Sequence, residues 1–195
     1  FIFLSSSMVY GNFKKKEVTE NDKCEPIGIY GALKYSAEKI ILAYNQVFNL
    51  PYTILRPSAL YGERCISRRV GQIFIEHSLL NQDIIINGDG SDKLDFTYIE
   101  DLVNGVCKII ENSNSYNQIF NLTYGNAKKI SEMIDVLKTF FPKIVVKKKE
   151  REKLMPERGT LLINKARDLL NYQPLWPLEK GYPKYIKWYI DFFKK

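Results

Sequence analysis

Short apolar runs alternate along the chain with segments in which apolar residues recur every three or four positions. The short runs are typical of buried strands, and they cover residues 1–4, 52–55, 84–86, 118–122 and 144–146. The periodic segments are typical of helices, and they cover residues 30–48, 68–80, 99–110, 130–141, 164–170 and 182–193. This alternation predicts an α/β fold.

The two N-terminal elements carry the clearest expectations about burial. The run 1–4 predicts a strand that is buried on both faces of a parallel sheet, and we expect it to find no partner strand in the chain that follows. The segment 30–48 predicts a helix that ends before Pro51. We expect its core-facing residues to be Leu33, Ala37, Ile40, Ile41, Tyr44 and Phe48.

The composition is that of an ordinary globular protein. Of the 195 residues, 45% are hydrophobic and 26% are charged, and no apolar run approaches the ~20 residues that cross a bilayer. Cys24, Cys65 and Cys107 form no C-x-x-C pair, so we expect reduced thiols, a cytoplasmic location and no metal site. The single histidine, His77, lies on an apolar stripe and is expected to be structural.

The net charge of +7 comes largely from lysine runs within residues 14–16 and 143–153. Such runs are usually solvated surface. Nucleic-acid binding is the alternative interpretation, but no aromatic platform accompanies the lysines, so we expect no nucleic-acid partner. An excess of cations also suits an anionic substrate.

Tyr30 and Lys34 stand four positions apart, and therefore one turn apart on one face of the predicted helix. In a partly dry site the ammonium stabilises the ionised phenol, which allows the tyrosine to accept a proton. The spacing alone is a weak signal, because many helices place a half-buried tyrosine beside a solvated lysine. The order of the surrounding motifs is what favours a catalytic role.

Five motifs follow one another along the chain. They are the serine cluster and Tyr-Gly of residues 5–11, the Tyr-Lys segment 30–34, the Arg-Pro segment 56–62, the glycine turn 88–91 and the segment 95–101. In this order they resemble the extended short-chain dehydrogenase/reductase family, which comprises NAD-dependent epimerases and dehydratases of nucleotide sugars. The resemblance covers nearly the whole chain.

The resemblance implies a Rossmann fold, a doubly wound parallel sheet, with a smaller α/β C-terminal lobe that binds substrate. It assigns residues 1–62 and 94–123 to the dinucleotide-binding domain, and residues 63–93 and 124–195 to the lobe. The family's glycine-rich segment G-x-x-G-x-x-G has no counterpart here, so we expect an N-terminally truncated domain that lacks its front βαβ units. The implied cofactor is NAD, with NADP as the alternative.

The resemblance also implies roles for individual residues. Ser6, Tyr30 and Lys34 correspond to the catalytic triad, with Ser5 and Ser7 as the alternative serines. We expect the cofactor to contact this triad together with Pro57 and Ser58. The expected substrate contacts are Ser7, Tyr10, Ala59, Arg69, Val70, Lys93 and Arg158.

The positions after Ser6 distinguish the reactions of the family. Sugar 4,6-dehydratases carry an aspartate-glutamate pair there, and related decarboxylases usually carry a glutamate at the second position. This chain has Ser7 and Met8, neither of which is a strong acid or base at neutral pH. The resemblance therefore implies an epimerase that acts through a transient 4-keto sugar, with 4-ketoreductase, decarboxylase and dehydratase activities as alternatives.

Three positions depart from the family pattern. Ala59 replaces an asparagine that commonly contacts the nucleotide sugar, and Leu94 and Met155 stand where arginines are common. The candidate replacements for the lost cations are Arg64, Arg68, Arg69, Lys93, Arg151 and Arg158. These departures motivate an alternative of another class, a non-catalytic NAD-binding scaffold.

The implied partners are a nucleotide-diphosphate sugar and a second copy of the chain. Family members often pair through the helix that carries the tyrosine and the lysine. In this chain Leu33, Ala43 and Val47 place apolar residues on more than one side of that helix. We therefore expect a homodimer.

Overall fold

The structure, a computed structural model, describes residues 1–193. Its helices are α1 Gly28–Phe48, α2 Val70–Leu79, α3 Ile99–Glu111, α4 Ile130–Lys138, α5 Asn164–Leu170 and α6 Leu178–Phe193, with 3-10 turns at Ser7–Tyr10 and Ser113–Ser115. Its strands are β1 Ile2–Leu4, β2 Glu17–Val18, β3 Thr53–Arg56, β4 Leu60–Tyr61, β5 Ile84–Asn87, β6 Lys93–Leu94, β7 Thr97–Tyr98, β8 Gln118–Asn121, β9 Lys128–Lys129, β10 Val146–Lys149 and β11 Thr160–Leu161.

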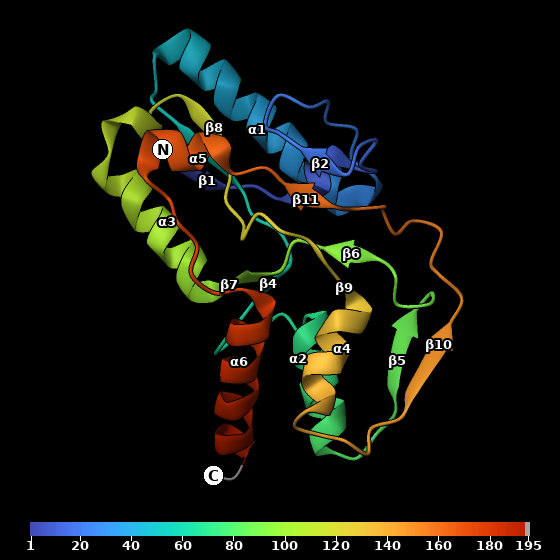
Figure 1. Cartoon of the computed structure of the whole chain (residues 1–195). Helices are drawn as coiled ribbons and strands as arrows, with labels where there is room; N and C mark the ends of the chain where they lie inside the picture. Colours follow the sequence, from blue (N-terminus) through green and yellow to red (C-terminus); the bar gives the residue numbers. More distant parts are fainter. Residues whose placement is uncertain (194–195) are drawn as a thin grey trace.

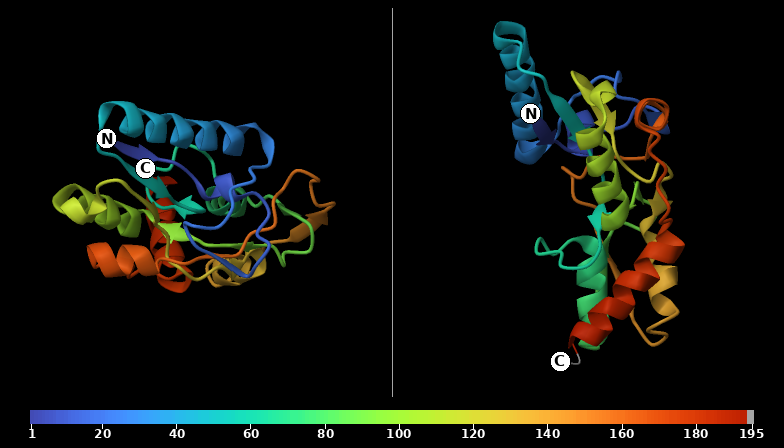
Figure 2. Two further views of the ribbon diagram at one scale, coloured as in Figure 1. Left: turned by 90° about the horizontal axis from the view of Figure 1, so that it is seen from above. Right: turned by 90° about the vertical axis from the view of Figure 1, so that its left-hand side faces the viewer.

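A parallel sheet of order β1-β3-β8 forms the centre of the first body of the molecule. Helix α1 lies on one side of this sheet, and α3 and α5 lie on the other (Figure 2). Leu55 and Phe120 of the strands pack with Leu102 of α3 and Ala166 of α5 in one apolar cluster. This arrangement confirms the predicted α/β class with a parallel sheet.

A second body is built from α2, α4 and α6 beside the parallel pair β5–β10 (Figure 1). Phe74, Leu137, Tyr182 and Ile186 belong to its apolar core. Tyr182, Tyr185, Trp188 and Tyr189 of the last helix are therefore packing residues, as predicted, whereas Phe192 is 60% exposed. Helix α5 falls within the range assigned to the lobe from sequence, but it packs against α3 and β8 of the first body.

The prediction of a strand in a parallel sheet is confirmed for β1, whereas the expectations that it has no partner strand and that both of its faces are buried are wrong. It pairs in parallel with β3, with Ile2 opposite Thr53 and Leu4 opposite Leu55. Within residues 1–193 no strand pairs with its other edge, and the side chains of Phe1 and Leu4 are 63% and 43% exposed. Both faces of a parallel strand are buried only where other elements cover them, and β1 also lacks a neighbouring strand at one edge within the described residues.

Helix α1 is confirmed, but most of its expected core face is wrong. Leu33 and Phe48 are 65% and 68% exposed, and Ile40 and Tyr44 are also exposed. The buried residues of this 21-residue helix are Gly31, Glu38 and Ile41. The helix crosses a narrow sheet, so that only a thin stripe of its surface is covered.

The remaining expectations concern His77 and the apolar character of the helices. His77 is partly buried, and its Nδ1 lies 3.0 Å from the carbonyl oxygen of Asp83, which is a structural contact.

No helix within residues 1–193 has the length and apolar content needed to cross a membrane.

Candidate active site

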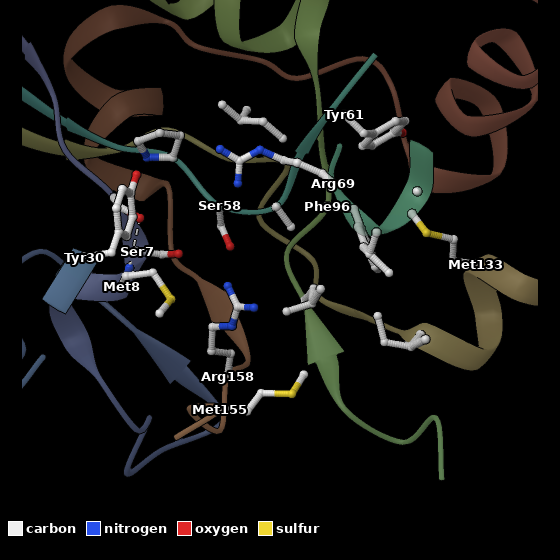
Figure 3. A pocket seen from close by; sticks show the side chains of 18 of the residues that line it. Ser7, Met8, Tyr30, Ser58, Tyr61, Arg69, Phe96, Met133, Met155 and Arg158 are labelled. Carbon is white, nitrogen blue, oxygen red and sulfur yellow. Dashed lines mark hydrogen bonds between the residues drawn. The ribbon is translucent and has the colours of Figure 1, made fainter. Parts of the chain in front are cut away.

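A cavity of about 550 Å³ lies between the carboxyl ends of β1 and β3 and the second body. Side chains from both bodies line it, and Figure 3 shows them. Tyr30, Ser7 and Met8 stand at one side of this view, and Phe96 and Met133 stand at the other. The carboxyl ends of parallel strands are where α/β sheets usually bind ligands.

The serine cluster continues the line of β1 into the cavity wall. Ser5 N donates to Leu55 O at 2.7 Å, and Ser7 N donates to Pro57 O at 2.9 Å, so the segment stays attached to β3 and to the residue after it. Ser6 is the N-cap of the following 3-10 turn, where its Oγ accepts a bond from Met8 N at 3.2 Å. The cap fixes the direction of the Ser6 side chain.

The side-chain hydroxyls of the serine cluster make different hydrogen bonds. Ser5 Oγ donates to the Glu38 carboxylate, so its proton is already used. Ser6 Oγ accepts in its capping bond and keeps its own proton available for donation. This difference supports Ser6 over Ser5 as the residue that donates to a bound substrate. Ser7 is buried and also lines the cavity.

Tyr30 and Lys34 enter the cavity from the first turns of α1. Lys34 Nζ donates to Leu4 O at 2.7 Å and lies 5.9 Å from the centroid of the Tyr30 ring. Gly31 permits this close approach, because a Cβ at that position would lie 2.6 Å from Met8 O. Tyr30 is 51% exposed, so its ring borders both cavity and solvent.

The loop after β3 closes another wall of the cavity. Pro57, Ser58 and Ala59 all line it. Ser58 is 3% exposed, and its Oγ has no hydrogen-bond partner among the described residues. Ala59 has φ 38°, in the left-handed region that a residue with a Cβ seldom adopts. A buried hydroxyl without a partner is costly unless a ligand completes it.

Two arginines face the same space, one at the start of α2 in the second body and one before β11, which pairs with β2. Arg69 precedes α2 and Arg158 precedes β11, and neither forms an ion pair with another described residue. The pKa of Arg158 is lowered to about 10, chiefly by burial; the negative charge of Asp92 opposes this shift and the positive charge of Arg69 adds to it. The Arg158 Nε also has no partner within residues 1–193. Two guanidinium groups that line one cavity suit a doubly charged anion.

The other arginine candidates have partners or lie outside the lining. Arg151 donates from Nε to both Asp92 oxygens at 3.1 Å. Arg68 pairs with Glu76 at 2.9 Å. Arg64 is not among the residues that line the cavity.

Most of the substrate and cofactor residues expected from sequence meet in this cavity. Val70 lines it together with the residues already described. Tyr10 does not; it is buried, donates from Oη to Asn121 Oδ1 at 2.7 Å, and has its pKa raised by burial. Lys93 is exposed on β6, opposite Lys129 of β9, and also lies outside the lining.

The cavity also contains residues to which the sequence analysis assigned no contact, although Leu94 and Met155 were noted there as departures from the family pattern. Asn87, Leu94, Phe96, Ile130, Met133 and Met155 form part of its lining on the side of the second body. Asn87 is the last residue of β5, and its Oδ1 has no partner within the described part of the chain. The one sequence signal that could have identified Asn87 is its position at a strand end before a glycine. The apolar residues follow the same sequence patterns as residues of the hydrophobic core.

Comparisons with known proteins agree with this geometry. The profile of the NAD dependent epimerase/dehydratase family matches residues 1–123. A putative UDP-glucose 4-epimerase of Methanocaldococcus jannaschii is 34% identical over 96% of this chain and 62% of its own length. An uncharacterised UDP-glucose epimerase of Bacillus subtilis is 29% identical over 93% of this chain and 57% of its own length.

Solved structures of UDP-sugar 4-epimerases match the fold of this chain closely. A UDP-glucuronic acid 4-epimerase from Bacillus cereus, in complex with UDP-glucuronic acid and NAD, has a TM-score of 0.93 at 28% identity and covers 98% of this chain. The match spans 62% of that protein. A UDP-glucose 4-epimerase from Thermotoga maritima with UDP-glucose has a TM-score of 0.91 at 29% identity, over 99% of this chain and 64% of that one. The chain thus spans about three fifths of the length of these proteins.

Proposed function

The chain belongs to the NAD dependent epimerase/dehydratase family, and we propose on this premise that the protein is an NAD-dependent nucleotide-sugar epimerase. We propose that it acts through a transient 4-keto sugar. The observation that carries the proposal is that Ser6, Tyr30 and Lys34 line one cavity together with Arg69 and Arg158. A proton-transfer pair and an anion site then face the same bound molecule.

The residues at the N-terminal side of the cavity fit NAD as the cofactor. Lys34 offers a cation beside Tyr30, and Ser58 offers a buried hydroxyl that lacks a partner among residues 1–193. We propose that Ser6, Tyr30, Lys34, Pro57 and Ser58 hold its nicotinamide end. When bound, NAD supplies the hydride acceptor and donor that passage through a 4-keto sugar requires.

The proposed chemistry of the chain is proton transfer at the sugar 4-hydroxyl. Tyr30 accepts the proton of that hydroxyl and later returns it. Lys34 stabilises the ionised phenol through its charge, and Ser6 donates a hydrogen bond to the same sugar oxygen as negative charge develops on it. Ser7 and Met8 supply no acid or base for removal of water from the sugar, which favours epimerisation over dehydration.

We propose a nucleotide-diphosphate sugar as the substrate. Arg69 and Arg158 would bind the diphosphate, and Ser7, Ala59 and Val70 would contact the remainder. The complexes of the similar proteins with UDP-glucuronic acid and UDP-glucose support this class. We also propose a cytoplasmic location, where the thiols of Cys24, Cys65 and Cys107 would stay free.

A homodimer is the proposed assembly. The exposed apolar side chains of α1 include Ile29, Leu33, Ile40 and Val47. An apolar helix face of this kind marks an interaction surface.

The proposal is tested by product analysis with the full-length protein. UDP-glucose and UDP-glucuronic acid are each incubated with the protein and NAD, and the sugar is followed by proton NMR. The proposal predicts the C4 epimer of at least one of them with no net reduction of NAD. A 6-deoxy-4-keto sugar, a pentose, or stoichiometric change in NAD would instead assign the dehydratase, decarboxylase or ketoreductase activity. Binding of NAD with no conversion would favour the scaffold.

A further inference from the structure

A buried ion pair lies directly behind the cavity wall. Glu38 of α1 and Arg56 of β3 have side chains that are 1% and 3% exposed. Arg56 donates from Nε to Glu38 Oε1 at 3.0 Å and from Nη2 to Glu38 Oε2 at 2.6 Å. Ser5 Oγ donates to the same Oε1. The Glu38 carboxylate therefore accepts hydrogen bonds both from β3 and from the segment that follows β1.

The network continues beyond the pair. Arg56 Nη1 donates to Tyr10 Oη at 3.0 Å and to the carbonyl oxygen of Glu20 at 3.2 Å. Tyr10 in turn donates to Asn121 of β8. One set of buried bonds thus joins the end of β1, the 3-10 turn, α1, β3 and β8.

Three members of the network, Ser5, Glu38 and Arg56, lie close in sequence to residues of the proposed active site. Ser5 precedes Ser6, and Arg56 precedes Pro57. Glu38 lies about one turn beyond Lys34 and about two turns beyond Tyr30 on α1. The bond between Ser5 and Glu38 is consequently a direct tie between the segment that carries the serine and the helix that carries the tyrosine and lysine.

Helix α1 has few other fixed points. Its buried residues are Gly31, Glu38 and Ile41, whereas most of its apolar side chains are exposed. A helix held by so little apolar surface depends on its specific polar bonds for its position. A buried ion pair is often no more stabilising than apolar residues of similar volume, and its best attested benefit is to specify one arrangement.

We propose that Glu38 is a positioning residue, which holds Ser6 in register with Tyr30 and Lys34 through its bonds to Ser5 and Arg56. The inference rests on the proposed function. Glu38 does not line the cavity, so it acts through the elements that it ties together. Misplacement of reacting groups by about 1 Å costs on the order of 100-fold in rate, so loss of the tie lowers kcat more than it alters substrate binding.

The test compares Ser5→Ala with Ser5→Thr in the full-length protein with NAD. Ser5→Ala removes the bond to Glu38 and leaves the ion pair intact, whereas Ser5→Thr keeps a hydroxyl. Ser5→Ala is expected to lower kcat at least about tenfold while KM stays within about threefold, and Ser5→Thr to recover most of the loss. Glu38→Gln, which preserves side-chain volume, is expected to lower kcat in the same way.

Leu170→Ala and Tyr30→Phe serve as controls for lost stability and for the proposed function. Leu170→Ala removes a buried side chain of α5 that makes none of the bonds of the network, and it is expected to lower thermal stability with kcat unchanged. Wild-type kcat in both Ser5→Ala and Glu38→Gln overturns the inference, as does an equal loss of kcat in Leu170→Ala at matched stability. If Tyr30→Phe keeps wild-type turnover, the proposed function fails instead. If Tyr30→Phe is inactive while Ser5→Ala and Glu38→Gln are both fully active, the positioning role alone fails.

Discussion

At the scale of single residues, Arg158 is the side chain whose surroundings most clearly require a ligand. Its Nε is buried and has no partner within the described chain, and the nearby charge of Arg69 opposes its own, although Asp92 partly offsets this. A diphosphate would relieve both costs at once, because it supplies acceptors and negative charge. Arg151, close by in sequence, already has Asp92 as its partner.

This contrast gives a matched pair of variants. Arg158→Met should raise KM for the nucleotide sugar by about ten- to 100-fold, as expected for loss of a charge-assisted bond of about 1.5–3 kcal/mol, with a smaller effect on kcat. Arg151→Met should leave KM within about threefold. Steady-state kinetics on both variants decides the matter, and an equal rise of KM in the two would contradict the assignment of Arg158.

The sequence predicted the N-terminal half of the site better than the half in the second body. Ser6, Tyr30 and Lys34 follow elements whose order is recognisable, so their meeting in one cavity was predictable. Asn87 and Met133 reach the cavity only through the packing of β5 and α4, which no local pattern encodes. Tyr10 fits the motif as well as Ser6 does, but its hydroxyl is bound by Arg56 and Asn121 inside the protein.

At the scale of elements, α1 combines an end that lines the cavity with a long exposed apolar face. Ile29, Leu33, Ile40 and Val47 recur on one side of the helix at four- and seven-residue steps. Periodicity predicted the helix itself correctly, since it depends on local spacing. It did not predict which face would be covered, because this depends on how many strands lie beneath the helix.

The exposed face makes the assembly testable. Leu33→Glu places a charge within it and should convert a dimer into a monomer, because a buried unpaired carboxylate is strongly unfavourable. Gln46→Glu adds the same charge elsewhere on α1 and should leave the dimer intact. Light scattering coupled to size-exclusion chromatography reports both masses. An unchanged mass for Leu33→Glu, or a monomeric unaltered protein, would refute pairing through this face.

The sequence predicts elements that a local pattern determines, but not elements that form through contact between distant segments. Helix α5 matches its prediction, whereas the two-residue strands β2, β4, β6, β7, β9 and β11 had no counterpart in the sequence analysis. A pair of residues carries no periodicity, and such strands form only where distant segments meet. The pairing of β2 with β11, which joins Val18 to Leu161, is an example.

At the scale of the whole molecule, Asp95 ties three separate segments together. Its carboxylate accepts bonds from Thr123 Oγ1 at 3.1 Å, Gly125 N at 3.1 Å and Leu161 N at 3.0 Å. The side chain is fully buried, and burial raises its pKa to about 6 in spite of these bonds. Folding therefore disfavours the charged form relative to an ordinary aspartate.

The sign of the resulting pH dependence follows from this shift. Below the ordinary pKa of 3.8 the group is protonated in both states, and above about 6 it is charged in both. Between these values the folded state binds more protons, so the contribution of Asp95 to the free energy of unfolding falls as pH rises, by roughly 3 kcal/mol in total. Urea denaturation of the unaltered protein and of Asp95→Asn at pH 4 to 7 measures this. Identical pH profiles for the two would show that Asp95 is not the source.

The central claim is that Tyr30 carries out proton transfer at the sugar, beside Ser6 and Lys34. Tyr44 lies on the same helix with nearly the same exposure, 52% against 51%, and outside the cavity, so it is a matched control. The most direct measurement is kcat for Tyr30→Phe and Tyr44→Phe in the full-length protein, with NAD binding measured on each. The account predicts a loss of at least about 100-fold for Tyr30→Phe with NAD still bound, and none for Tyr44→Phe. Near wild-type turnover in Tyr30→Phe would contradict it.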